Sequence, residues 1–163
     1  MTNVRIHRAD YADPAHGAAL VALLDDYARD PMGGGAPLSN AVRTNVVAGL
    51  AAQPSAFSLL AYADDAPIGL ANCFWGYSTF AARPLVNVHD IVVASAWRGK
   101  GIAEALFTEI EAMARAEGAC KVTLEVLSGN ARAKALYAKL GYGDYVLDPE
   151  IGHALFWQKR LAA

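Results

Sequence analysis

The stretch "DIVVASAWRGKGIA", residues 90–103, restricts most strongly the folds that this chain can adopt. An apolar strand pattern runs into Arg98-Gly99-Lys100-Gly101, and a helical pattern begins immediately afterwards. The first amides of a helix lack intrahelical partners and lie at the positive end of its dipole. Glycine lets the backbone approach a ligand closely, and the two cations add positive charge. The stretch therefore predicts an anion site suited to a phosphate or pyrophosphate.

Two common phosphate-binding motifs do not match this turn. A P-loop requires Gly-x-x-x-x-Gly-Lys-Ser/Thr, whereas Lys100 is followed by glycine and has no glycine at the required upstream spacing. A dinucleotide fingerprint matches at Gly99 and Gly101, but Glu104 stands where the last glycine is needed. A helix start that contains two glycines and binds nothing is the alternative interpretation.

Composition limits the classes of protein to consider. The 163 residues suit one domain, 1–163, with a real core, and no apolar run reaches the length of about 18–20 residues that a membrane span needs. The first ten residues lack the apolar stretch of a signal peptide, so we expect a cytoplasmic location and no membrane partner. A formal net charge of −2 argues against a nucleic-acid partner.

The metal-binding residue types are sparse. Cys73 and Cys120 lie far apart without a Cys-x-x-Cys pair, which argues against a disulfide scaffold and a zinc site. The four histidines show no i, i+4 pairing. We therefore expect no metal.

Periodicity and turn residues predict one mixed α/β (α+β) domain. Helices are expected at 14–29, about 39–52, about 101–117 and from about 130 to 140. Strands are expected at 3–9, 56–63, 66–77, 85–94, 120–127, 142–147 and 152–159. The segment at 76–84 is expected to be a long polar and aromatic connection between two of them.

Two motifs together resemble the GNAT N-acetyltransferases. The first is Arg98-x-x-Gly101-x-Ala103 after "DIVV", which is similar to that family's Arg/Gln-x-x-Gly-x-Gly/Ala turn. The second is "SGNARAKALYAKLGY", where the family's Asn, Ala, Tyr, Gly and Phe positions hold Asn130, Ala133, Tyr137, Gly141 and Tyr142. The resemblance implies a central, mixed but mostly antiparallel sheet of about seven strands with about four helices.

The resemblance also implies acetyl-CoA as cosubstrate, with its pyrophosphate held by the amides of the turn. Ala103 in place of the last glycine is a common variation in the family and leaves slightly less room against the phosphate. The residues that would contact the coenzyme are Ile91, Val92, Val93, Arg98, Gly99, Lys100, Gly101, Ile102, Ala103, Asn130 and Tyr137.

Acetyl transfer to an amine needs a base, donors for an oxyanion and an acid for the departing thiolate. The resemblance places Tyr137 beside the coenzyme sulfur, and a phenol with a reference pKa of about 10 is protonated at neutral pH. Its alternative role is a core aromatic, because it shares a helix face with Ala133 and Leu140. The oxyanion donor would be the amide of Ile91 or Val92, on a strand that the family splays from its neighbour.

The base is expected at the end of the central strand. Alternation predicts Val86, Val88, Asp90 and Val92 on one face, and Asn87, His89, Ile91 and Val93 on the other. The segment "WGYSTFAARPLVNVHDIVV", residues 75–93, resembles the spermidine/spermine and diamine acetyltransferase branch. In that branch a Glu-Asp pair ends the strand, and the glutamate is assigned as the base. His89 replaces that glutamate, which puts a polyamine acceptor in doubt. The alternatives are a hydrogen-bonded structural His89 and a structural Asp90.

The acceptor is expected near the first two helices and their connection. The predicted contacts are Tyr27, Met32, Trp75, Tyr77, His89 and Asp90. Asp30, Phe80 and the glycines at 33–35 are further candidates, and the 30–37 loop is either a lid or an ordinary surface loop.

These features predict an acetyl-CoA-dependent N-acetyltransferase that acts on the primary amine of a small molecule, such as an amino-acid-like compound or a diamine, by direct transfer. The resemblance also implies a homodimer. The alternatives are a non-catalytic acyl-CoA-binding or sensing module on the same fold, a protein or peptide N-acetyltransferase, and a nucleotide-phosphate-binding protein of another family. The failed phosphate motifs count against the last.

Overall fold

The computed structural model describes residues 3–161. The chain divides after Leu124 into two compact units, here called the N-terminal unit and the C-terminal unit. None of the helices in the described part of the chain has both the length and the apolar character needed to cross a membrane.

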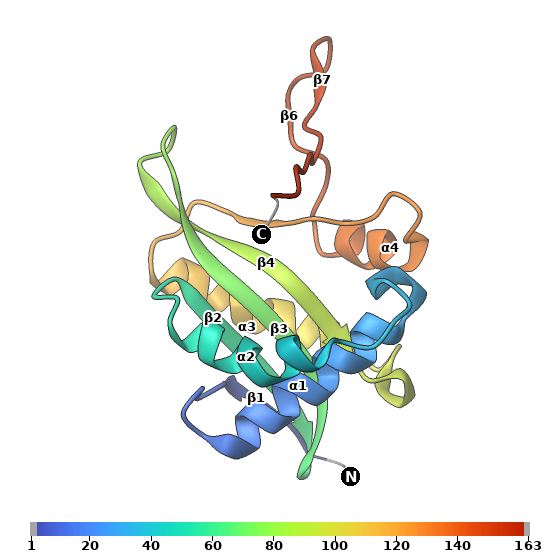
Figure 1. Ribbon diagram of the computed structural model, residues 1–163. Helices are drawn as coiled ribbons and strands as arrows, with labels where there is room; N and C mark the ends of the chain where they lie inside the picture. The colour runs from blue at the N-terminus through green and yellow to red at the C-terminus, as the bar shows by residue number, and fades with distance from the viewer. Residues whose placement is uncertain (1–2, 162–163) are drawn as a thin grey trace. The chain divides into compact units, whose positions relative to one another are not determined.

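The N-terminal unit is built on a five-stranded sheet (Figure 1). Its strands, in spatial order, are β1 (Val4–Arg8), β2 (Ala56–Ala63), β3 (Ala66–Ser78), β4 (Arg83–Val93) and β5 (Val122–Leu124). The pairs from β1 to β4 are antiparallel, and β4 pairs with β5 in parallel. The predicted mixed, mostly antiparallel sheet is thus confirmed.

Helices cover both faces of this sheet. Figure 1 shows α1 and α2 on one face and α3 on the other. The helices are α1 (Pro14–Arg29), α2 (Asn40–Ala51) and α3 (Ile102–Ala116), with short 3₁₀ turns η1 (Pro31–Gly33) and η2 (Ser95–Trp97). The face that carries α1 and α2 is called the α1 face, and the opposite one the α3 face.

Local capping chemistry explains where α1 and α2 begin. The Asp13 carboxylate accepts the Ala15 amide at 2.8 Å, and proline occupies the first helical position. The Ser39 hydroxyl accepts the Val42 amide at 3.2 Å at the start of α2. From these starts, α1 buries Leu20 and Leu23 on the α1 face of the sheet.

The α3 face needs a glycine where the helix comes closest to β3. A Cβ built at Gly69 would lie 3.1 Å from Ile102 Cγ2 and 3.2 Å from Leu106 Cδ1. Leu106 is fully buried, as are Phe107 and Ile110 farther along the helix. The glycine therefore lets α3 pack directly against the strand that lies beside β4.

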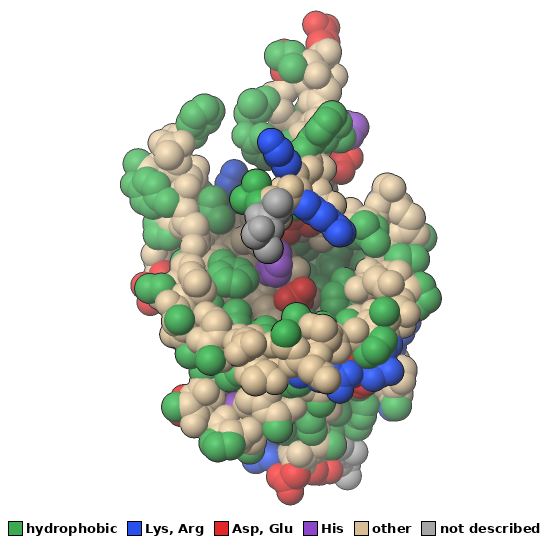
Figure 2. Space-filling model, in the orientation of Figure 1, with side chains coloured by type: hydrophobic (Ala, Val, Ile, Leu, Met, Phe, Trp, Pro, Cys, Tyr) green, Lys and Arg blue, Asp and Glu red, His purple; other side chains and the backbone are tan. Residues whose placement is uncertain are grey.

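The β3–β4 hairpin corrects one prediction. The expected long connection at 76–84 is a short turn, because β3 runs on to Ser78 and β4 begins at Arg83. Ala82 takes a positive φ of 50° in this turn. Figure 2 shows apolar side chains at the projecting end of the hairpin, where Phe80 is 93% exposed.

The C-terminal unit contains α4 (Ala131–Lys139) and a separate two-stranded ladder of β6 (Val146–Asp148) and β7 (Gly152–His153). The strands predicted at 142–147 and 152–159 are therefore shorter, and a single sheet of about seven strands was wrong. Alternating apolar residues predict a half-buried strand only where a neighbouring sheet covers them. Here Phe156 is 78% exposed. The four predicted helices are all present.

Candidate active site

A β-bulge on β4 shapes the centre of the candidate site. Asn72 on β3 pairs with Asp90, and the next β3 residue, Cys73, pairs with Val88, so His89 is the extra residue. The imidazole of His89 meets the Phe74 ring edge-on at 5.6 Å between centroids. Because Phe74 lies on the same face as Asn72, the bulge brings the side chains of His89 and Asp90 to the α1 face together.

This arrangement corrects the predicted alternation of β4. Simple alternation placed Asp90 with Val86 and Val88, and His89 on the opposite face. The register instead pairs Val86 with Trp75 and Val88 with Cys73, on the α3 face. An extra residue reverses the phase of every residue after it, which is why the prediction failed.

β4 continues beyond the point where β5 leaves it. The parallel ladder covers only Val86–Val88 against Val122–Leu124. β4 then runs five residues further, to Val93. Within the N-terminal unit, the β4 residues after Val88 thus have no pairing with β5.

The edge of β4 that faces away from β3 presents the backbone of Ile91. The Val93 carbonyl accepts the Arg98 Nε–H at 3.1 Å, while the Ala94 amide bonds to Ile68 on β3. Hydrogen-bonding groups of successive strand residues point to alternate edges. Ile91 therefore directs its amide to the edge that β5 leaves, whereas Val92 directs its amide to β3 and buries its side chain in the core.

The glycine turn connects this strand to α3. Gly99 and Gly101 have φ angles of 76° and 80°, in the left-handed region that favours glycine. Gly101 is the N-cap of α3 and makes no side-chain cap. A Cβ at either glycine would meet no protein atom within 4 Å, so backbone conformation rather than crowding within the protein requires these glycines. The space beside Gly99 and Gly101, just before α3, is thus open.

The two cations of the turn are held by protein groups. Arg98 donates to Val93 and forms an ion pair with Asp30 Oδ2 at 3.1 Å. Lys100 Nζ lies over the Trp97 ring, 4.6 Å from its centroid. Ile102 turns its side chain into the core, so a ligand at the turn would contact the backbone of this residue rather than its side chain.

Asp30 also organises the connection between the first two helices. Its carboxylate accepts the Met32 amide at 2.9 Å, and its carbonyl accepts those of Gly33 and Gly35. Met32 is exposed on this loop. Tyr27 lies near Asp90 and Asp30, and its pKa is raised by burial first and then by these two carboxylates. The structure thus brings Tyr27 and Asp90 together on the α1 face.

Two predicted acceptor contacts lie elsewhere. Trp75 is on the α3 face, where its ring centroid is 5.6 Å from that of Phe57. Tyr77 follows two residues later, exposed near the end of the hairpin. The structure does not group either side chain with His89 and Asp90.

The C-terminal unit holds the other two predicted coenzyme contacts. Asn130 is the N-cap of α4, and its side-chain oxygen accepts the Ala133 amide at 3.1 Å. Tyr137 is buried on α4 and meets Tyr142 edge-on, with 6.4 Å between ring centroids. Asn130 therefore caps the helix that carries Tyr137.

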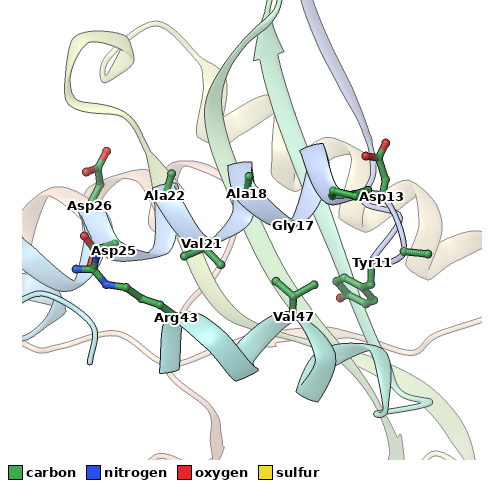
Figure 3. Close-up of a pocket in the computed structure, with 12 residues that line it drawn as sticks. Tyr11, Asp13, Gly17, Ala18, Val21, Ala22, Asp25, Asp26, Arg43 and Val47 are labelled. Carbon is green, nitrogen blue, oxygen red and sulfur yellow. The ribbon is translucent and has the colours of Figure 1, made fainter. Parts of the chain in front are cut away.

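A groove of about 810 Å³ lies between α1 and α2 (Figure 3). Gly17, Ala18 and Val21 of α1 and Val47 of α2 form its apolar part, and Tyr11 lies at one end. Sequence reasoning missed this groove. The small residues Gly17, Ala18 and Ala22 of α1 are a sequence signal that could have indicated it.

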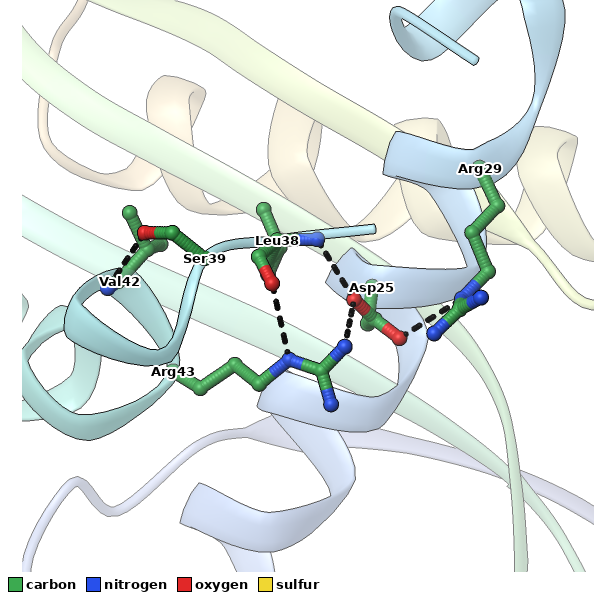
Figure 4. Close-up of polar contacts among 6 residues, drawn as sticks. All are labelled: Asp25, Arg29, Leu38, Ser39, Val42 and Arg43. Carbon is green, nitrogen blue, oxygen red and sulfur yellow. Dashed lines mark hydrogen bonds and ion pairs between the residues drawn. The ribbon is translucent and has the colours of Figure 1, made fainter. Parts of the chain in front are cut away.

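Asp25 ties together the elements at the other end of the groove (Figure 4). Its carboxylate accepts the Leu38 amide at 2.8 Å and pairs with Arg29 and Arg43, each at 2.9 Å. Partial burial raises the pKa of Asp25, but the Leu38 amide and the two guanidinium groups lower it by more, so the net pKa lies below 3.8. The carboxylate is thus ionised at neutral pH.

Asp25→Asn is expected to melt a few degrees below the wild type at pH 7, because the amide loses both ion pairs. A carboxyl whose pKa is lower in the folded state stabilises the fold above its unfolded pKa and loses this effect as the pH falls through its folded pKa. The difference in melting temperature should therefore shrink below about pH 4. Thermal unfolding at pH 7 and pH 3 tests this, with the exposed neighbour Asp26→Asn as control. An equal difference at both pH values would contradict the assignment.

The buried Cys73 adds no reactive thiol to the site. Burial first, and the Asp90 charge second, raises the pKa of the Cys73 thiol to about 12, so it stays protonated and unreactive. Residues 3–161 contain no group of three or more His, Cys, Asp or Glu side chains that could hold a metal ion.

Comparison with known proteins agrees with this geometry. The chain matches the model of the acetyltransferase (GNAT) family over residues 20–142. It is 32% identical over 77 residues to a thialysine N-epsilon-acetyltransferase of Bos taurus. That match covers 47% of this chain and 45% of the relative, so it spans less than half of that protein's length.

Two solved structures show the same fold along nearly the whole chain. A possible acetyltransferase from Clostridium difficile 630 has a TM-score of 0.79 at 19% identity, covering 98% of this chain and 99% of its own. An aminoglycoside acetyltransferase from an uncultured soil metagenomic sample, in complex with sisomicin, has a TM-score of 0.75 at 14% identity, covering 96% and 97%. Because the family match extends over most of the 163 residues, the chain belongs to the GNAT family of acetyltransferases.

Proposed function

We propose that this protein is an acetyl-CoA-dependent N-acetyltransferase that acetylates the primary amine of a small molecule by direct transfer. The observation that carries the proposal is a combination of two features. β4 continues after Val88, where its pairing with β5 ends, and a glycine turn with left-handed φ angles leads into α3. The strand supplies backbone groups for a thioester, and the turn supplies amides for a pyrophosphate.

The turn fits the coenzyme on physical grounds. The first amides of α3 lie beside Gly99 and Gly101, where an added Cβ would enter open space rather than protein. A pyrophosphate in that space would accept hydrogen bonds from these amides and interact favourably with the helix dipole. Lys100 adds a positive charge beside the turn. Asn130 and Tyr137 are further proposed contacts, through the family resemblance.

The proposed reaction assigns one role to each group. A base, either His89 or Asp90 directly or through water, takes a proton from the acceptor ammonium. The amine nitrogen then bonds to the thioester carbonyl carbon, and the Ile91 amide donates to the oxygen as it gains charge. When the carbon–sulfur bond breaks, the Tyr137 hydroxyl protonates the departing thiolate. The nitrogen loses its second proton to solvent, and solvent returns one proton to the Tyr137 phenolate. The products are the acetylated amine and free coenzyme A.

The acceptor is proposed to bind on the α1 face. Tyr27, His89 and Asp90 lie there, and Met32 is exposed on the neighbouring loop. The names of the thialysine and aminoglycoside acetyltransferases, which match this chain in sequence and in fold, support a small amine as substrate. A homodimer is also proposed, through the family resemblance, and light scattering on the purified protein would test it.

Calorimetry with acetyl-CoA, followed by thiol release against a panel of amines, tests the proposal. We expect binding, with turnover on one class of primary amine. Binding without turnover on any amine or peptide would favour the acyl-CoA sensor instead. Absence of binding would overturn the assignment of the turn and the proposed activity with it.

A further inference from the structure

Two polar residues are buried in the otherwise apolar core of the N-terminal unit. Among the residues that the structure describes, Ser58 and Asn72 are the polar ones classed as buried, at 0% and 2% exposure. Burial of an amide or hydroxyl is costly unless its hydrogen bonds are satisfied, and an apolar pair of similar shape would fill the same space without that cost. Their presence therefore calls for an explanation beyond packing.

These residues form a hydrogen-bonded chain with a single direction. The Ser58 hydroxyl donates to Asn72 Oδ1 at 2.6 Å, which uses its one proton. Tyr11 lies 2.8 Å from the Ser58 oxygen and must therefore be the donor in that contact. Asn72 Nδ2 donates to Asp90 Oδ2 at 3.0 Å. In every bond the donor is the residue farther along the chain from the carboxylate, and each bond polarises the next.

The chain ends where the bulge begins. Asn72 is the last β3 residue before the register shift, and it pairs directly with Asp90. The amide therefore fixes the direction of the Asp90 carboxylate from the buried side of the sheet. The titratable groups near Asp90 are Tyr27 from α1, His89, its neighbour on β4, and Cys73 from β3, whose side chain lies on the opposite face of the sheet. Cys73 stays neutral, because burial raises the pKa of its thiol.

We propose that Asn72, itself held by Ser58 and Tyr11, is the positioning residue for Asp90 in the acetyl-transfer site. Its role in catalysis depends on the proposed function, whereas its effect on the Asp90 carboxylate does not. A donated hydrogen bond favours the ionised form of a carboxyl group and limits its rotation. Asn72 thus holds the Asp90 carboxyl group aimed at the α1 face, where the acceptor ammonium is proposed to bind.

Asn72→Leu is the direct test, because leucine has the same number and branching of side-chain heavy atoms and cannot donate. The Asp90 carboxyl titration, followed by carbon-13 NMR in the ligand-free protein, should move to higher pH by about one unit, since hydrogen bonds to charged groups are comparatively strong. The acid limb of the kcat/KM profile should move in the same direction. The Kd of acetyl-CoA should stay within about twofold of the wild type, because the chain does not reach the glycine turn.

Ser58→Ala and Tyr11→Phe remove the two earlier donors and should give progressively smaller shifts of the same sign. Ser58→Ala decides the matter if Asn72→Leu does not fold. A folded Asn72→Leu or Ser58→Ala variant with an unmoved Asp90 titration would overturn the proposal. A further outcome is a wild-type protein that acetylates no amine, together with variants that still shift the Asp90 titration relative to it. That result would support the positioning role and remove the proposed function.

Discussion

Replacing Tyr137 by phenylalanine is expected to lower kcat about 100-fold or more while leaving the Kd of acetyl-CoA nearly unchanged. The substitution removes one hydroxyl, and positioned general acids contribute rate factors of about 10²–10⁴. The ring that meets Tyr142 edge-on is kept, so the packing of the C-terminal unit should survive. Single-turnover measurements of coenzyme A release, combined with calorimetry, would separate the chemical step from binding.

Tyr142→Phe is the matched control for this result. It removes the hydroxyl from the other member of the same aromatic pair, and no catalytic role is proposed for that residue. Its kcat should stay within about twofold of the wild type. Equal losses in the two variants would show that packing of the pair, rather than proton donation by Tyr137, limits turnover.

Gly101→Ala is expected to weaken acetyl-CoA binding about tenfold, which corresponds to about 1.4 kcal/mol. The φ of 80° at this position strains any residue with a side chain, and the added methyl group would enter the space proposed for the pyrophosphate. Left-handed backbone strain alone costs about 1–2 kcal/mol in folding stability. Calorimetry measures the affinity, and thermal unfolding measures the stability.

Gly118→Ala separates strain from binding. Gly118 follows α3, has a φ of 71° and, like Gly101, has open space where a Cβ would lie. The two variants should lose similar stability, whereas only Gly101→Ala should lose affinity. If both variants bound acetyl-CoA as tightly as the wild type, the turn would not be the pyrophosphate site.

Much of the N-terminal unit could be predicted because its boundaries are encoded locally. Asp13-Pro14 gives α1 a cap and a first residue, and the helix runs from Pro14 to Arg29 as predicted. Asp64 and Asp65 form the β2–β3 turn, with Asp64 at a φ of 52°. The turn before α3 is equally local, since Gly99 and Gly101 both take positive φ angles.

Features that depend on distant partners could not be predicted. The ion pair between Arg98 and Asp30 joins residues 68 positions apart, and neither residue signals the other in the sequence. Asn72 was also missed, although a single asparagine within the apolar strand "GLANCF" was a usable signal of a satisfied buried amide. Apolar alternation near the end of the chain predicted strands, but alternation does not show whether another sheet covers their apolar face.

The bulge leaves His89 outside the pairing of β3 and β4, although its side chain lies in the candidate site. With that residue removed, the pairs on either side, Asp90 with Asn72 and Val88 with Cys73, would follow one another in an ordinary antiparallel ladder. His89 is thus an insertion that both flanking ladders tolerate. The β3–β4 register therefore places no requirement on the side chain at this position, so the group presented there is set by the site rather than by strand pairing.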